Sequence, residues 1–96
     1  MPKFLVIHPI PRNVMEGMSE IPPEENKQII ELRSYCSVDA YWIKSWYVPE
    51  LEKLFCEWNA KDAESIRKVW DENIKGIGID SIAEMIIVDA EEYREK

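Results

Sequence analysis

Residues 46–62, WYVPELEKLFCEWNAKD, predict two strand-like segments around a turn, followed directly by the start of a helix. Aromatic and apolar residues flank a turn that contains Pro49, which is typical of a β-hairpin. Asp62 is a good N-cap residue, and Glu64 would lie in the first turn of the following helix. We therefore expect a hairpin of residues 40–48 and 53–59 that leads into a helix.

The segments outside the hairpin complete the order strand, helix, strand, strand, helix, strand. Residues 3–8, KFLVIH, form a short apolar run that predicts a buried strand. A first helix is expected from residues 22 and 23, both proline, to about residue 38, and a second from residue 62 to the glycines at 76 and 78. The last strand is expected over residues 79–89. Residues 9–22 form a long connection that could act as a lid or contact a partner.

This order predicts an α+β fold with one domain over residues 1–89 and a charged tail at residues 90–96. Crossovers through both helices are expected to place the first and third strands side by side and in parallel. The sheet would be four-stranded and otherwise antiparallel, with both helices on one face. The other face would have no cover from the chain itself.

Large apolar side chains are expected on both faces of this sheet. Simple alternation puts Trp42 and Trp46 on one side of the second strand, and Tyr41, Ile43 and Tyr47 on the other. A single domain of 96 residues can cover only one of these faces. An exposed apolar patch of this kind usually marks an interface, so we expect a homodimer that packs sheet to sheet. The alternative is a monomer with an aromatic sheet face in water.

The charge balance argues against several classes of partner. The chain carries 19 acidic and 12 basic residues, for a formal net charge of -7. This charge repels phosphate backbones and anionic membrane surfaces, so we expect no nucleic-acid partner and no membrane partner. No apolar stretch approaches the roughly 20 residues needed to cross a bilayer, which favours a cytoplasmic protein. Cys36 and Cys56 lack metal-binding spacing and are expected to be reduced core thiols.

His8 and Glu57 are the candidates for proton transfer or metal binding. His8 ends the first strand, and its pKa would allow it to act as an acid, a base or a ligand near neutrality. Glu57 shares a predicted strand face with Phe55 and Asn59, where desolvation would raise its pKa. A packed strand-end histidine and an ion pair of Glu57 with Lys44 are the structural alternatives.

Trp42, Trp46, Glu57 and Asn59 are the candidate ligand-binding residues. The chain has four tryptophans, which could line a pocket for a flat ligand or could serve only the core and a dimer interface. Cys56 could be a thiolate ligand, but an apolar strand offers nothing to lower its pKa. No nucleophile with an adjacent base is found, so catalysis is not predicted.

The chain resembles a family of small ferredoxin-like bacterial and archaeal proteins that are often described as nickel-binding. The resemblance rests on the opening Met1-Pro2-Lys3-Phe4-Leu5, His8, Trp46 nine residues before Phe55-Cys56, Ala60, Asp62-Ala63-Glu64, Val69, Ile82 and Glu84. It implies a ferredoxin-like βαββαβ sandwich that associates through its sheet, as in dimeric α+β barrels. It also implies nickel or another divalent transition metal as a possible cofactor, with His8 and Glu57 as candidate ligands.

This chain departs from the family at positions that bear on metal binding. Near the end of the second helix, where the family commonly carries histidines, it has Trp70 and Ile74. The acidic residue typical at the end of the third strand is Asn59 here. Since nickel and zinc favour imidazole and thiolate donors, a site with one imidazole would need Cys56, carboxylates or a second subunit.

Three functional hypotheses follow. The first is a non-catalytic dimer that binds a metal ion or a small ligand. The second is an enzyme similar to cofactor-independent monooxygenases or isomerases, with an aromatic-lined cavity in which His8 or Glu57 moves a proton. The third is a protein interaction module that uses residues 9–22. An enclosed pocket of a few hundred Å³ that contains His8 or Glu57 would favour the enzyme.

Overall fold

The computed structural model of the chain describes residues 1–94 and contains four strands and three α-helices. In chain order the elements are β1 (Lys3–Pro9), α1 (Arg12–Ser19), the 3-10 turn η1 (Pro23–Glu25), α2 (Lys27–Ser34), β2 (Ala40–Val48), β3 (Lys53–Ala60), α3 (Ala63–Asn73), β4 (Ser81–Met85) and the 3-10 turn η2 (Ala90–Tyr93). The predicted βαββαβ order is confirmed, with α1 as an addition. The architecture is the expected ferredoxin-like α+β fold.

The four strands form one sheet in the order β2-β3-β1-β4. The first and third strands are neighbours as predicted, but they run antiparallel, so the parallel pairing expected from the sequence is wrong. The reason lies in the hairpin. The crossover through α2 brings β2 back in the direction of β1, and the hairpin then reverses the chain so that β3 runs against both. β4 also pairs antiparallel with β1.

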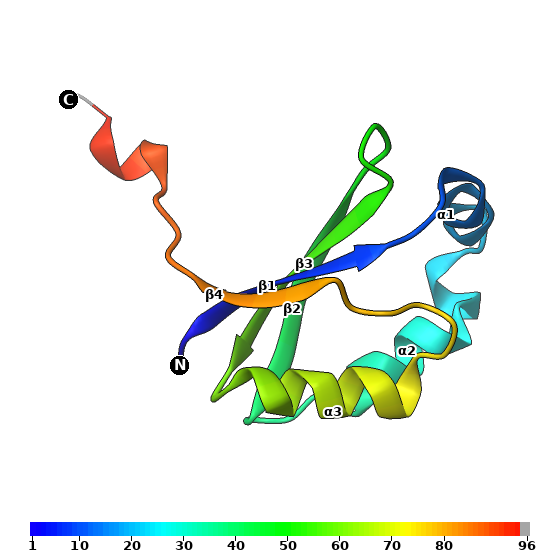
Figure 1. Cartoon of the computed structure of the whole chain (residues 1–96), viewed down its shortest axis with the longest axis horizontal. Coiled ribbons are helices and arrows are strands. Elements are labelled where there is room, and N and C mark those ends of the chain that lie inside the picture. Colours follow the sequence, from blue (N-terminus) through cyan, green and yellow to red (C-terminus); the bar gives the residue numbers. More distant parts are fainter. Residues whose placement is uncertain (95–96) are drawn as a thin grey trace.

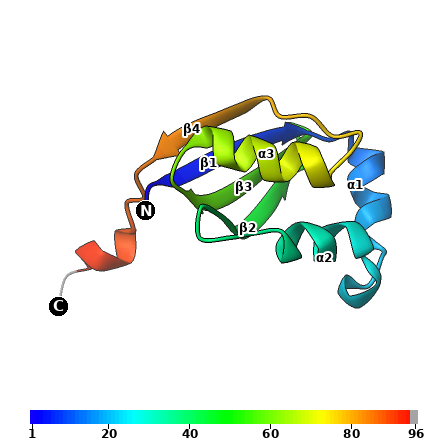
Figure 2. The ribbon, with the colours of Figure 1, turned by 90° about the horizontal axis from the view of Figure 1, so that it is seen from below.

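Two helices cover one face of the sheet and leave the other face bare. Figures 1 and 2 show α2 and α3 side by side on the same side of the four strands, while α1 lies beyond the end of β1. The long connection predicted over residues 9–22 therefore contains an additional helix, α1, because Pro11 precedes a short amphipathic segment. No helix within residues 1–94 is long and apolar enough to cross a membrane.

Capping side chains decide where the two covering helices begin. Asp62 caps α3 as predicted, since its carboxylate accepts a hydrogen bond of 2.8 Å from the backbone N–H of Ser65. α2 begins later than the two prolines suggested, because the side chain of Asn26 accepts a hydrogen bond of 3.3 Å from the backbone N–H of Ile29. α2 also ends at Ser34, four residues before the expected boundary at about residue 38.

The chain beyond β4 leaves the body of the domain. β4 ends at Met85, so the strand is shorter than the predicted range of residues 79–89. Figure 1 shows the following segment running away from the sheet to η2 near the C-terminus. Residues 90–94 of the predicted charged tail include this turn, and residues 95 and 96 lie outside the described part of the chain.

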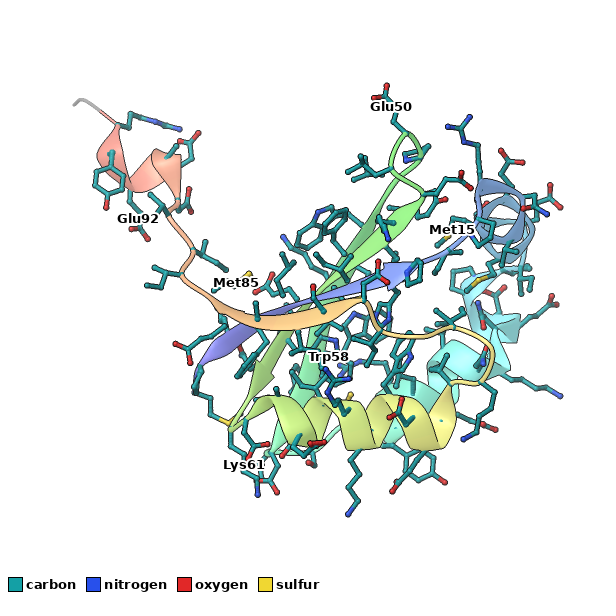
Figure 3. All side chains as sticks on the ribbon, in the orientation of Figure 1. Met15, Glu50, Trp58, Lys61, Met85 and Glu92 are labelled. Atoms are coloured by element: carbon teal, nitrogen blue, oxygen red, sulfur yellow. The ribbon has the colours of Figure 1, made fainter. Side chains whose placement is uncertain are left out.

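The hydrophobic core fills the layer between the sheet and the helices. Its most deeply buried residues include Val6, Trp58, Ala60 and Ile66, each with no measurable exposure. Figure 3 shows Trp58 between the sheet and α3, and Met85 on the opposite side of the sheet. The helix-facing side of the sheet is thus the interior of the domain, and we refer to the other side as the open face.

Candidate functional site

A small apolar cavity lies in the layer between the sheet and the helices. Its volume is about 30 Å³, which leaves room for little more than a water molecule or two. Its walls are almost wholly apolar. The lining residues are Ile10, Met18, Gln28, Ile29, Leu32, Trp42, Ser45, Leu54, Cys56, Trp58, Trp70, Ile74 and Ile77.

Alternate residues of strand β3 form one wall of this cavity. Leu54, Cys56 and Trp58 share one face of the strand, as simple alternation requires. This face points to the helices, and all three residues line the cavity. Phe55 and Glu57 point to the open face. The register of β3 therefore separates an apolar wall from the carboxylate that the sequence placed among the candidate ligands.

A bulge in β2 separates two tryptophans that the sequence analysis placed on the same face. The pairing of β2 with β3 shifts between Trp42 and Lys44, so that Ile43 is an extra residue. Trp42 consequently pairs with Trp58 and lines the cavity, whereas Trp46 pairs with Phe55 on the open face. The expectation that Trp42 and Trp46 share a side is wrong for this reason.

A short chain of hydrogen bonds runs along the cavity wall. The Trp42 indole Nε1–H donates to Ser45 Oγ at 2.8 Å, and the Ser45 hydroxyl donates to Cys56 Sγ at 2.9 Å. Burial raises the pKa of the Cys56 thiol to about 11, and the hydrogen bond from Ser45 offsets only part of this rise. Cys56 is thus a protonated, buried thiol near neutral pH, as the structural alternative predicted.

Trp58 lines the cavity and carries a buried hydrogen-bond donor that is unused within residues 1–94. Its side chain has no measurable exposure, and its indole Nε1–H finds no hydrogen-bond partner within residues 1–94. A buried donor without a partner costs about 1–3 kcal/mol of desolvation free energy. Native interiors rarely keep such a group without a reason, which makes this atom the most informative polar feature of the cavity.

His8 is buried beside the cavity and makes one hydrogen bond. Its Nδ1 lies 2.9 Å from the carbonyl oxygen of Gly78, so Nδ1 carries the proton and donates. The imidazole stacks on the Trp70 indole with ring centroids 3.8 Å apart. Burial lowers the pKa of His8, although the Gly78 hydrogen bond and the charge of Asp80 oppose this change. Nε2 is therefore a neutral acceptor, and it has no partner within the described residues.

Glu57 and Asn59 lie on the open face, away from His8. Lys3 Nζ contacts both of them, at 3.0 Å from a Glu57 carboxylate oxygen and 3.0 Å from Asn59 Oδ1. Lys44 is the cross-strand neighbour of Glu57, as an ion pair between these two residues would require. The ion pair within the described residues is nevertheless with Lys3. Because His8 faces the helices, one subunit cannot bring His8 and Glu57 to the same ion.

Trp46 belongs to a separate aromatic cluster on the open face. Its ring stacks on Phe55 with centroids 6.5 Å apart, and Lys44 Nζ lies 5.9 Å from the ring centroid. The indole is 43% exposed, so it has surface to offer a partner. Of the four predicted ligand-binding residues, only Trp42 lies at the interior cavity.

Several cavity residues were missed by the sequence analysis. Ser45 and Ile77 contribute to the wall, and Gly78 holds the histidine through its carbonyl oxygen. Trp58 was not missed, since it is one of the four tryptophans that the sequence offered as possible pocket residues. The carbonyl of Gly78 has no signature in the sequence, because any residue could supply it.

Residues 4–85 match the family described as Nickel responsive protein SCO4226-like. The chain belongs to this family. The match spans the whole β1 to β4 sheet apart from Lys3, and it ends where the chain leaves the domain. Comparison with the curated proteins and with the solved structures finds no match.

The donor set of this SCO4226-like chain does not fit a nickel centre. Within residues 1–94 no three side chains of the kind that bind metals come together. His8 offers one nitrogen without a partner in this part of the chain, but its ring stacks on Trp70, and the Cys56 thiol is protonated. A second subunit packed on the open face could not reach His8, which points to the helices.

We expect nickel titrated into the protein to show no saturable binding tighter than about millimolar by calorimetry. The double variant Trp70→His with Ile74→His is expected to gain binding at about micromolar concentration, since both positions line the cavity next to His8. Circular dichroism would verify that this variant folds. Tight binding by the unaltered chain that disappears in His8→Ala would contradict this expectation.

Proposed function

We propose that this protein is a non-catalytic binding protein whose interior cavity takes a small, largely apolar ligand that carries one hydrogen-bond acceptor. The observation that carries the proposal is that Trp58, which lines this apolar cavity, has a fully buried indole Nε1–H without a partner in the described chain. A carbonyl or ether oxygen on the ligand would accept this hydrogen bond, and the remaining surface of the ligand would meet apolar side chains.

The ligand would enter by displacing the helical cover. A ring such as benzene needs a cavity of roughly 150 Å³, whereas the cavity here measures about 30 Å³. The cover over it is lightly held, because α1 has no buried residue and α2 has only Leu32. Elements with so few buried contacts are those that open first in native proteins. Met18 of α1 and Gln28, Ile29 and Leu32 of α2 are the parts of this cover that line the cavity.

The chemistry around the cavity favours binding over catalysis. The Cys56 thiol has its pKa raised to about 11 and is a poor nucleophile. His8 does not line the cavity, and Glu57 lies on the other side of the sheet. The enzyme alternative needs a pocket of a few hundred Å³ around one of these two residues, and this cavity is roughly a tenth of that size.

Association into a homodimer through the open face is part of the proposal. The helices cover one face of the sheet, and the other face presents Trp46 stacked on Phe55. Leu5 and Ile7 of β1 point to the same side, because the alternate residues Val6 and His8 are buried toward the helices. Contiguous apolar side chains without a cover are typical of protein interfaces. The dimer would bury the Trp46 cluster and leave the interior cavity intact in each subunit.

Cyclopentanone is a suitable probe of the cavity, because it combines a small ring with one carbonyl acceptor. We expect it to bind and to shift the indole N–H resonance of Trp58 in ¹H–¹⁵N spectra. Trp58→Phe keeps an aromatic ring and removes the donor, so its affinity should be about tenfold weaker. Trp46→Phe removes an indole N–H from the open face and should bind as the unaltered chain does.

The same titration can contradict the proposal in two ways. Equal affinity of Trp58→Phe and the unaltered chain would mean that the indole N–H does not donate a hydrogen bond to the ketone oxygen. A Trp58 resonance that stays in place up to tens of millimolar ketone would mean that the cover does not admit a ring of this size.

A further inference from the structure

The segment that follows β4 presents an apolar run to water. Residues 86–93, which we name the C-terminal arm, extend away from the sheet in both ribbon views. Ile86 is 89% exposed, Val88 is 73% exposed and Tyr93 is 73% exposed. Ile87 is also exposed. Three consecutive β-branched residues in an extended segment are typical of a strand or a docking peptide and are unusual in a solvated tail.

The open face has the properties needed to receive such a segment. Its centre is formed by the Trp46 and Phe55 rings. Lys44 on β2 lies beside this centre, with its Nζ 5.9 Å from the Trp46 ring centroid, and it is in no ion pair within residues 1–94, whereas Lys3 is paired with Glu57 and Lys53 with Asp80. The arm carries the opposite charge next to its apolar run, at Asp89, Glu91 and Glu92. The two surfaces therefore complement each other in both apolar character and charge.

The area of the open face is too small to hold a dimer alone. Four strands of five to nine residues, spaced about 4.8 Å apart with a rise of about 3.3 Å per residue, cover roughly 460 Å² in projection. A stable interface buries about 800 Å² on each partner. Additional surface from each chain is needed, and the arm is the exposed apolar segment that adjoins the sheet.

We infer that the C-terminal arm of one copy packs across the open face of a second copy, and that the second copy returns the same contact. This inference rests on the proposed dimer and states how its interface is completed. A reciprocal exchange satisfies two-fold symmetry, since each subunit contributes one arm and one face. Ile86 and Val88 would lie against the aromatic centre, and the acidic residues beyond them would reach Lys44 beside it.

Sedimentation of full-length variants tests the energetic part of this inference. We expect Ile86→Asp combined with Val88→Asp to raise the dimer dissociation constant at least tenfold, because burial of even one such side chain is worth about a decade or more in a binding constant. Val38→Asp makes the same chemical change at a residue that is 84% exposed outside the arm. It should leave the dissociation constant unchanged.

A cross-linking experiment tests where the arm lies. Benzophenone placed at residue 88 of an isotopically heavy copy, mixed with unlabelled light copies, should cross-link to light peptides that contain Trp46 or Phe55. A cross-link confined to the same heavy chain would show that the arm folds back on its own face and would overturn the inference.

The failure of the arm and the failure of the dimer are distinguishable. If the arm variant dimerises as tightly as the unaltered chain, the arm inference is wrong and the proposed dimer survives. If the unaltered chain is a monomer at micromolar concentration, both are wrong. The cavity proposal is unaffected by either result, because its ketone titration does not depend on the oligomeric state.

Discussion

Trp70→Ala is expected to lower the free energy of unfolding by about 3–5 kcal/mol. The indole is 4% exposed, stacks on His8 and lines the cavity, so truncation would leave a large void in the core. It would also remove the hydrogen bond of 2.9 Å that the Trp70 Nε1–H donates to the Ile77 carbonyl. A domain of this size loses about 4–8 °C of Tm per kcal/mol, so Tm should fall by roughly 12 °C or more. Urea unfolding followed by far-ultraviolet circular dichroism measures the change.

One variant separates the hydrogen bond of Trp70 from its packing, and a second variant serves as a surface control. Trp70→Phe keeps a ring against His8 and loses the hydrogen bond to Ile77, so we expect a loss of about 1–2 kcal/mol. Tyr35→Ala removes an aromatic side chain that is 61% exposed and should change stability by no more than about 0.5 kcal/mol. If Trp70→Ala were as mild as Tyr35→Ala, the core would not depend on the contact between α3 and His8.

The fold could be predicted from the sequence because its signals are local. The hairpin consists of two short runs of aromatic and apolar residues, and the turn between them spans Pro49 to Glu52 as expected. Asp62 marks the start of α3 by a cap that needs only neighbouring residues. The alternation of β3 also holds without interruption, so Phe55, Glu57 and Asn59 share one face as expected.

The errors in the fold arise where one residue changes the register or where a short helix has weak signals. The bulge at Ile43 moves Trp42 to the interior, and a period of two cannot anticipate an inserted residue. α1 has prolines before it and Gly17 inside it, which are the usual marks of a loop. Its helical state depends on local hydrogen bonds to the Pro11 carbonyl from Val14 and Met15.

The sequence predicted which residues are candidates for the site, but it did not predict which of them lie on the same face of the sheet. His8, Trp42 and Cys56 were all singled out from the sequence, and all three face the helices. Glu57 and Trp46 were grouped with them, although both lie on the open face. The placement of His8 depends on the Gly78 carbonyl, 70 residues away along the chain. Contacts of such separation follow from the packing of α3 and the β4 connection, which a single sequence does not specify.

The last prediction concerns the charge state of His8. Burial lowers the pKa of the folded imidazole below the ordinary value of 6.5. The unfolded chain therefore binds a proton below about pH 6.5 that the folded chain does not bind. Stability should be constant near pH 7.5 and should fall as the pH decreases from 6.5, by up to about 1.4 kcal/mol per pH unit. Urea unfolding between pH 7.5 and pH 5.5 measures this slope.

His8→Gln is the matched control, because its side-chain amide can still donate to the Gly78 carbonyl and does not titrate. Its stability should vary little over the same pH range, which would assign the slope to the imidazole. Asp62 does not interfere in this range, because the hydrogen bonds from Ser65 lower its pKa below 3.8 and its contribution is lost only at more acid pH. Stability that rises as the pH decreases through 6.5 would instead indicate a charged His8 in the folded state. It would contradict the assignment of a neutral imidazole whose Nδ1–H donates to Gly78 and whose Nε2 is an unprotonated acceptor.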